Sequence, residues 1–209
     1  MVADDSVERA ERLYSELLAD MADRIDAAAT FVSVPGSWPL ARAAAGELRG
    51  VLELLILSGL LTNRARIEEA ETALAGLNRK RALELVRGVN EDWWPKPVVT
   101  YPDHINYRVG DDWLTETQWD AYYSKTSGVL HIRNPFTREA PRLDNTIRWL
   151  TELVNLSRAL LSAHLVYYDE TTFLLGQIGP PDQLPRVWVN RFVPPERLAG
   201  AQHEQSAGS

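Results

Sequence analysis

The sequence contains no cysteine, and its 209 residues include only three lysines, four histidines and two methionines. The absence of cysteine excludes disulfide bonds, cysteine-ligated metal sites and cysteine nucleophiles. The first six residues show neither a basic segment nor an apolar one, which argues against a secretory signal peptide. These features together favour the cytoplasm of a bacterium as the location of the protein.

Long hydrophobic runs are also lacking. The most apolar segment covers residues 51–61, which is about half the length that a membrane-spanning helix needs, and it contains Glu53. We therefore expect this segment to form a buried helix, and we expect no association with a membrane.

The charge of the protein is unevenly distributed along the chain. The formal net charge is −7, which excludes a protein that binds nucleic acid over its whole surface. Residues 1–30 contain eight acidic and three basic side chains, whereas residues 123–149 contain five basic and two acidic ones. The second segment could therefore hold one local anion, even though the protein as a whole is acidic.

Several catalytic signatures are missing. The sequence has no glycine-rich dinucleotide fingerprint, no phosphate-binding loop, no Gly-x-Ser-x-Gly elbow and no His-Glu-x-x-His zinc helix. The leading hypothesis is therefore a binding or regulatory module without catalysis of its own. Such a module needs no cofactor or metal, and it would form a homodimer or serve a protein partner.

The hydrophobic pattern predicts a mainly α fold. Apolar residues recur at helical spacing, which predicts helices over residues 5–30, 37–61, 62–78, 79–87, 115–126 and 144–168. The expected caps are Ser37, Asn78, Asp144 and the capping box Thr115–Gln118, and Gly88 is expected to end the helix over residues 79–87. Residues 89–114 contain clustered prolines and predict an ordered loop with short strands at Val98–Val99 and Tyr107–Val109. Thr171–Ile178 and Arg186–Val193 are rich in β-branched and aromatic residues and predict two strands.

Taken together, these segments predict one domain over residues 1–193. It is expected to be a helical bundle with a C-terminal β-hairpin. Residues 194–209 are polar and rich in proline, glycine, serine and glutamine, which predicts a disordered tail.

The basic segment supplies the first candidate site. If the chain is extended at His131-Ile132-Arg133, the imidazole and the guanidinium project to the same side and can bind a phosphate. The predicted anion-binding residues are His131, Arg133, Asn134, Arg138, Arg142 and Arg148. With Lys125 they also define a basic island that could bind nucleic acid without cleaving it. In the alternative interpretation, Asn134-Pro135 forms a turn and the neighbouring side chains are structural.

The second candidate is the pair Arg158 and His164. An arginine followed six residues later by a histidine resembles the catalytic motif of the HEPN superfamily, whose members are small helical bundles. This resemblance implies a metal-independent ribonuclease of a toxin or antiphage system, in which the arginine stabilises the charged phosphorane and the histidine transfers protons. Alternatively, the two residues lie at the edges of an ordinary core helix.

The third candidate is a surface for a partner protein. Aromatic residues in the proline-rich loop predict such a surface at Trp93, Trp94, Tyr101 and His104. The alternative is a structural loop whose aromatic side chains pack into the core.

Three segments resemble an uncharacterised class of bacterial helical proteins. They are Leu48–Leu61, Asn90–Pro97 (NEDWWPKP) and Leu130–Phe136 (LHIRNPF). The resemblance implies a helical fold and carries no activity with it.

Overall fold

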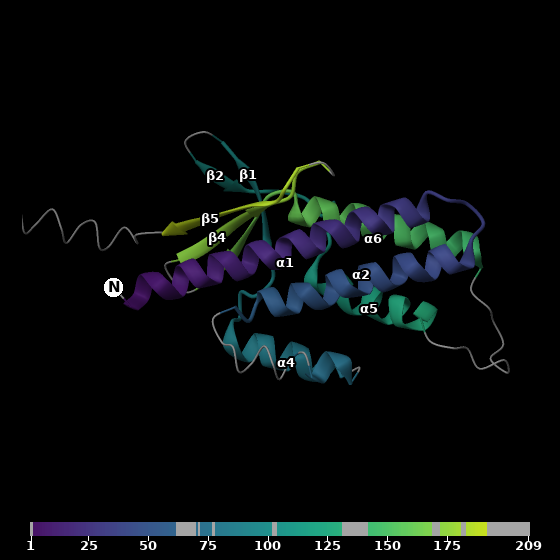
Figure 1. The fold of residues 1–209 in the computed structure, drawn as a ribbon, viewed down its shortest axis with the longest axis horizontal. Helices are drawn as coiled ribbons and strands as arrows, with labels where there is room; N and C mark the ends of the chain where they lie inside the picture. The colour runs from purple at the N-terminus through teal and green to yellow at the C-terminus, as the bar shows by residue number, and fades with distance from the viewer. Residues whose placement is uncertain are drawn as a thin grey trace, which may run out of the picture.

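A computed structural model describes residues 2–61, 70, 72–76, 78–101, 104–130, 142–168, 172–180 and 183–191. Its helices are α1 (Val2–Val32), α2 (Trp38–Ser58), α4 (Arg79–Val89), α5 (Glu116–Leu130) and α6 (Leu143–Leu161). Its strands are β1 (Lys96–Thr100), β2 (Ile105–Tyr107), β3 (His164–Tyr167), β4 (Thr172–Gln177) and β5 (Arg186–Arg191). Figure 1 shows α1, α2 and α6 side by side, with α4 and α5 against α2.

The two N-terminal helices follow the predicted pattern. In α1, one stripe of apolar side chains with i, i+3 and i+4 spacing is fully buried; it includes Tyr14, Leu18, Met21 and Ile25. Before α2, the Ser37 hydroxyl accepts a hydrogen bond from the amide of Leu40, as predicted for a cap. Among the described residues, no helix is long and apolar enough to cross a lipid bilayer.

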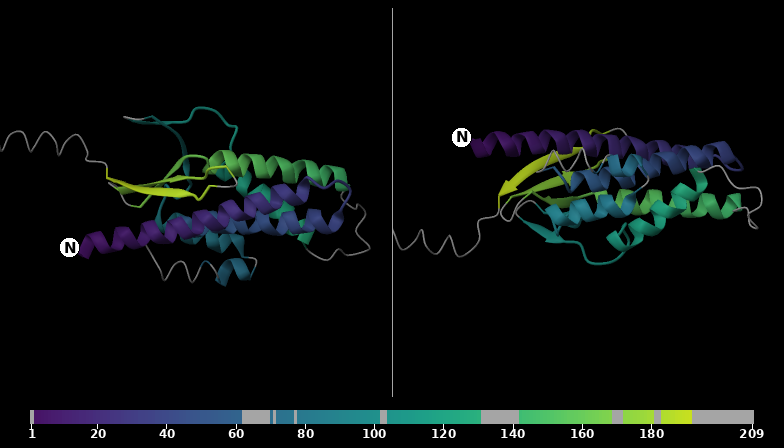
Figure 2. Two further views of the ribbon diagram at one scale, coloured as in Figure 1. Left: turned by 45° about the horizontal axis from the view of Figure 1, so that its top comes forward. Right: turned by 90° about the horizontal axis from the view of Figure 1, so that it is seen from below.

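The fold is mainly α, as predicted, but its β-structure is more than the C-terminal hairpin and the two short strands expected within residues 89–114. The strands β4 and β5 do form that hairpin, and they belong to a five-stranded antiparallel sheet with the order β2-β1-β3-β4-β5. Figure 2 shows from two further sides that the sheet lies at the end of the bundle where α1 begins and α6 ends.

The predicted helix over residues 144–168 differs most from the structure at residues 162–168, which do not continue the helix. The helix α6 ends at Leu161, and His164–Tyr167 form the central strand β3 between β1 and β4. Pairing of Leu165 with Lys96 and of His164 with Pro97 supplies backbone partners from a distant part of the chain, and β4 pairs along the other edge of β3. These long-range pairs outweigh a helical pattern that is local.

Other boundaries differ by a few residues. The helix α5 continues to Leu130 instead of ending near Thr126, and α4 continues to Val89, past the glycine expected at its end. The predicted caps Asn78 and Thr115–Gln118 are confirmed, because their side chains bond backbone amides of the first turn. Asp144 is wrong as a cap: Arg142 occupies that position without a side-chain bond. Residues 62–69 and the predicted tail lie outside the described residues.

The two faces of the sheet differ in what covers them. Leu174, Val166 and His164 point toward the helices, where the main hydrophobic core lies. The opposite face, which we call the outer face, centres on a small buried cluster of Val98, Leu165 and Leu175. Since side chains alternate along a strand, Gln177, Arg186 and Trp188 also project from the outer face.

A charged network joins α2 to α5 inside the bundle. The Arg49 side chain is only 9% exposed; its guanidinium lies 2.7 Å from Glu53 and donates to the hydroxyls of Ser127, at 2.6 Å, and Tyr123. Its carbon Cζ also lies 3.8 Å from the centre of the Tyr123 ring. Burial raises the pKa of Tyr123 to about 12, so this phenol stays neutral and can serve as a hydrogen-bond acceptor.

Replacing Arg49 with alanine is expected to lower the free energy of unfolding by about 2 kcal/mol, because buried hydrogen-bond acceptors lose their donor. The effect is kept moderate by Glu53, whose side chain is 31% exposed and can be hydrated. Arg49→Lys should restore little, since an ammonium lacks the planar fork that reaches three acceptors. Urea unfolding measures this, with Arg42→Ala on the exposed side of α2 as the control.

Candidate functional site

The histidine of the predicted ribonuclease pair lies in the core. His164 is 0% exposed, and its Nδ1 lies 3.2 Å from the carbonyl oxygen of Leu161. Because a carbonyl only accepts, Nδ1 carries the proton, and Nε2 accepts a hydrogen bond from the Tyr14 hydroxyl. Burial lowers the pKa of His164 to about 4, so the imidazole is neutral near pH 7.

The arginine of that pair has a different environment. Arg158 lies in the last turn of α6 and forms an ion pair with Asp26 of α1. The side chain of Arg158 is 32% exposed, whereas both ring nitrogens of His164 are bonded in the interior. The structure therefore does not bring the two groups together in one open site within this chain. The ribonuclease hypothesis stays a prediction, tested by RNA cleavage in EDTA with His164→Ala.

The predicted partner surface separates into buried and exposed parts. Contrary to that prediction, Trp93 is 0% and Trp94 is 7% exposed, because both rings pack into the main core, where Trp93 Nε1 donates to Glu116 at 3.1 Å. Tyr101 and His104 lie near the tip of the β1–β2 hairpin, and their rings stack with centres 4.5 Å apart. Only this second pair is available at the surface.

The basic island is described in part. His131, Arg133, Asn134 and Arg138 lie outside the described residues. Arg142 and Arg148 are exposed at the beginning of α6. Lys125 lies over the rings of Tyr122 and Trp149, 4.8 and 5.9 Å from their centres. Anion binding at this island stays a prediction.

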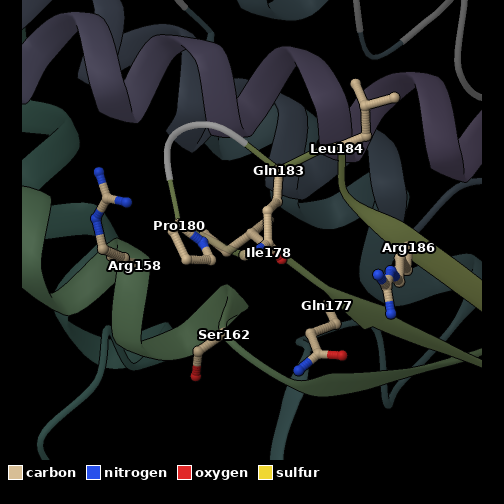
Figure 3. A pocket seen from close by; sticks show the side chains of 9 residues that line it. Arg158, Ser162, Gln177, Ile178, Pro180, Gln183, Leu184 and Arg186 are labelled. Carbon is tan, nitrogen blue, oxygen red and sulfur yellow. The ribbon is translucent and has the colours of Figure 1, made fainter.

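A cleft of about 440 Å³ opens where the end of α6 meets the β4–β5 hairpin. Figure 3 shows the contributing side chains, which come from α6, β4, β5 and the connections between them. We call it the α6–β5 cleft, and its described lining consists of Arg158, Ser162, Gln177, Ile178, Gly179, Pro180, Gln183, Leu184 and Arg186. Arg158 lies at one end of the view and Arg186 at the other.

The described lining of this cleft combines cations with neutral polar groups. It contains two arginines and no carboxylate. Gln177 and Arg186 are direct cross-strand partners, so their side chains leave the sheet next to each other. Arg186 is exposed, and it has no ion-pair partner within the described part of the chain. The described lining therefore presents hydrogen-bond donors and one arginine that pairs with no described carboxylate.

A second cleft, of about 370 Å³, lies against α2 and also contains two arginines, Arg24 and Arg49. Both are already neutralised: Arg24 pairs with Asp20 and Glu47, and Arg49 pairs with Glu53. The pair of Arg24 and Glu47 joins α1 to α2, whereas Arg186 forms no ion pair with any described carboxylate. The α6–β5 cleft is therefore the stronger candidate for binding a ligand.

Neither cleft suggests a metal centre. Among the described ranges, no group of three histidine, aspartate or glutamate side chains is placed to hold a metal ion. In the α6–β5 cleft, the described polar atoms belong to arginine, serine and glutamine, which suit an oxyanion better than a metal.

The sequence analysis missed Gln177 and Arg186, although it predicted the strands that carry them. The two side chains lie next to each other because of the register of β4 against β5. Ser162 lies near them because α6 ends at that point in the chain. The alternating pattern of two hairpin strands could have indicated the pair of Gln177 and Arg186, but not the helix end beside it. No family model, curated protein or solved structure matches this chain.

Proposed function

We propose that the protein is a binding or regulatory module that takes a small phosphate-bearing ligand in the α6–β5 cleft. The observation that carries this proposal is the exposed Arg186, which lines the cleft without an ion-pair partner in the described chain. A guanidinium offers planar pairs of N–H donors that match phosphate oxygens. Binding an anion there would neutralise a charge that the fold leaves uncompensated.

The neighbouring groups support an oxyanion with several acceptor atoms. The amides of Gln177 and Gln183 and the hydroxyl of Ser162 are neutral donors on three sides of the lining. Arg158, whose guanidinium is oriented and neutralised by Asp26, adds further N–H donors. A phosphate has more acceptor oxygens than a carboxylate and uses more of these donors.

The lining also supports binding without catalysis. Its described side chains include no histidine, aspartate, glutamate, lysine or tyrosine. Arginine stays protonated in proteins, so it cannot exchange a proton near neutral pH. Such a lining holds and orients an anion, but it offers no general base for a reaction.

Isothermal titration with ribose 5-phosphate tests this proposal. The wild-type protein is expected to bind it, and Arg186→Ala should weaken binding roughly tenfold or more through loss of a charge-assisted hydrogen bond. The matched control is Arg148→Ala, which removes an exposed arginine from the same protein ten residues before Arg158 on α6, about 15 Å along the helix. Absence of binding, or equal losses in both variants, would contradict the proposal.

A further inference from the structure

An exposed aromatic ring lies on β5 close to Arg186 of the α6–β5 cleft. Trp188 follows Arg186 by two residues on β5, so both side chains leave the strand on the outer face, about 7 Å apart. The Trp188 side chain is 39% exposed, and its direct cross-strand partner is Leu175, which is 8% exposed. An indole thus lies beside a buried apolar side chain and presents part of its surface to solvent near Arg186.

We propose that the ligand of the cleft is a nucleotide, whose phosphate binds at Arg186 and whose base stacks on Trp188. This inference rests on the proposed function of the cleft. A nucleotide joins an anionic phosphate to a planar aromatic base through a sugar. Its two ends therefore suit the guanidinium of Arg186 and the indole of Trp188, which lie two residues apart on β5. Stacking of a base on an aromatic side chain is favourable for any base, because every base has a π-face.

The charge distribution favours a mononucleotide over a long nucleic acid. The net charge of the chain is −7, and the acidic helix α1 packs along β5 on the opposite face of the sheet. An extended polyanion would be repelled by these carboxylates over most of its length. A phosphate placed at Arg186 meets instead a described lining that has one arginine outside the ion pairs and no carboxylate.

Titration calorimetry with adenosine 5′-monophosphate and ribose 5-phosphate tests the base contact. The wild type should bind the nucleotide roughly tenfold more tightly than the sugar phosphate. Trp188→Leu should remove this preference and leave the affinity for ribose 5-phosphate unchanged, and Trp188→Phe should retain part of it. Tyr107→Leu is the matched control: this ring is 60% exposed on the same face but lies four strands away, about 19 Å across the sheet.

The outcomes separate this inference from the proposed function. The nucleotide proposal would be overturned if the wild type bound the two ligands with equal affinity, or if the preference for the nucleotide survived Trp188→Leu. In either case, binding of ribose 5-phosphate that depends on Arg186 would still support a phosphate site in the α6–β5 cleft. Tighter binding of phenyl phosphate than of the nucleotide would also overturn it, in favour of a phosphorylated aromatic side chain. If neither phosphate ester binds, both proposals fail.

Discussion

Replacing Gly176 with alanine is expected to lower the free energy of unfolding by about 3 kcal/mol, because the added methyl group has no space. An alanine Cβ at this position would lie 2.7 Å from Cε1 and Nε2 of His164 and 3.0 Å from Cε1 of Tyr14. The imidazole cannot move away easily, since hydrogen bonds to Leu161 and Tyr14 hold both of its nitrogens. Urea unfolding monitored by circular dichroism measures the loss.

A double-mutant cycle identifies the cause of this loss. His164→Ala alone is destabilising, but it removes the ring that the new methyl group would meet. Adding Gly176→Ala to that variant should therefore cost much less than adding it to the wild type. The control is Gly88→Ala in α4, where an added Cβ meets nothing within 4 Å and should stabilise the helix by roughly 0.5–1 kcal/mol. Strictly additive losses would refute the steric explanation.

Acidification is expected to destabilise the protein through the same histidine. In the folded state His164 has a pKa of about 4, whereas the unfolded chain has the ordinary value of 6.5. Between these values the unfolded state binds a proton that the folded state excludes, so stability falls as the pH falls below 6.5. The loss is about 1.4 kcal/mol per pH unit, or about 2 kcal/mol by pH 5. Above pH 6.5 this contribution is constant.

The comparison that isolates this contribution uses the double variant Tyr14→Phe/His164→Phe. It removes both hydrogen-bonding partners together and keeps aromatic rings of similar size, so no polar group is left unpaired in their contact. Burial raises the pKa of Tyr14, which stays a neutral phenol throughout this pH range. Between pH 8 and pH 5 the unfolding free energy of the wild type should fall by about 2 kcal/mol relative to that of the variant. Parallel curves would show that His164 does not carry the effect.

The sequence by itself determined the elements whose signals are local. The stripe of apolar residues in α1, the Ser37 cap of α2, the Thr115–Gln118 capping box and the two strands of the C-terminal hairpin were all predicted, because periodicity and capping depend on residues only a few positions apart. Its acidic N-terminal segment also indicated where most of the net negative charge lies.

The tertiary structure alone decided where the central strand and the candidate site lie. Whether His164–Tyr167 extend a helix or form β3 depends on backbone partners in β4 and in β1, and β1 comes from a distant part of the chain. The burial of Trp93 and Trp94, expected at a surface, likewise depends on helices that pack around them. Arg158 pairs with Asp26, whereas Arg186 pairs with no described carboxylate. This contrast appears only when α1, α6 and β5 are placed together, because an ion pair requires proximity in space that spacing along the sequence does not encode.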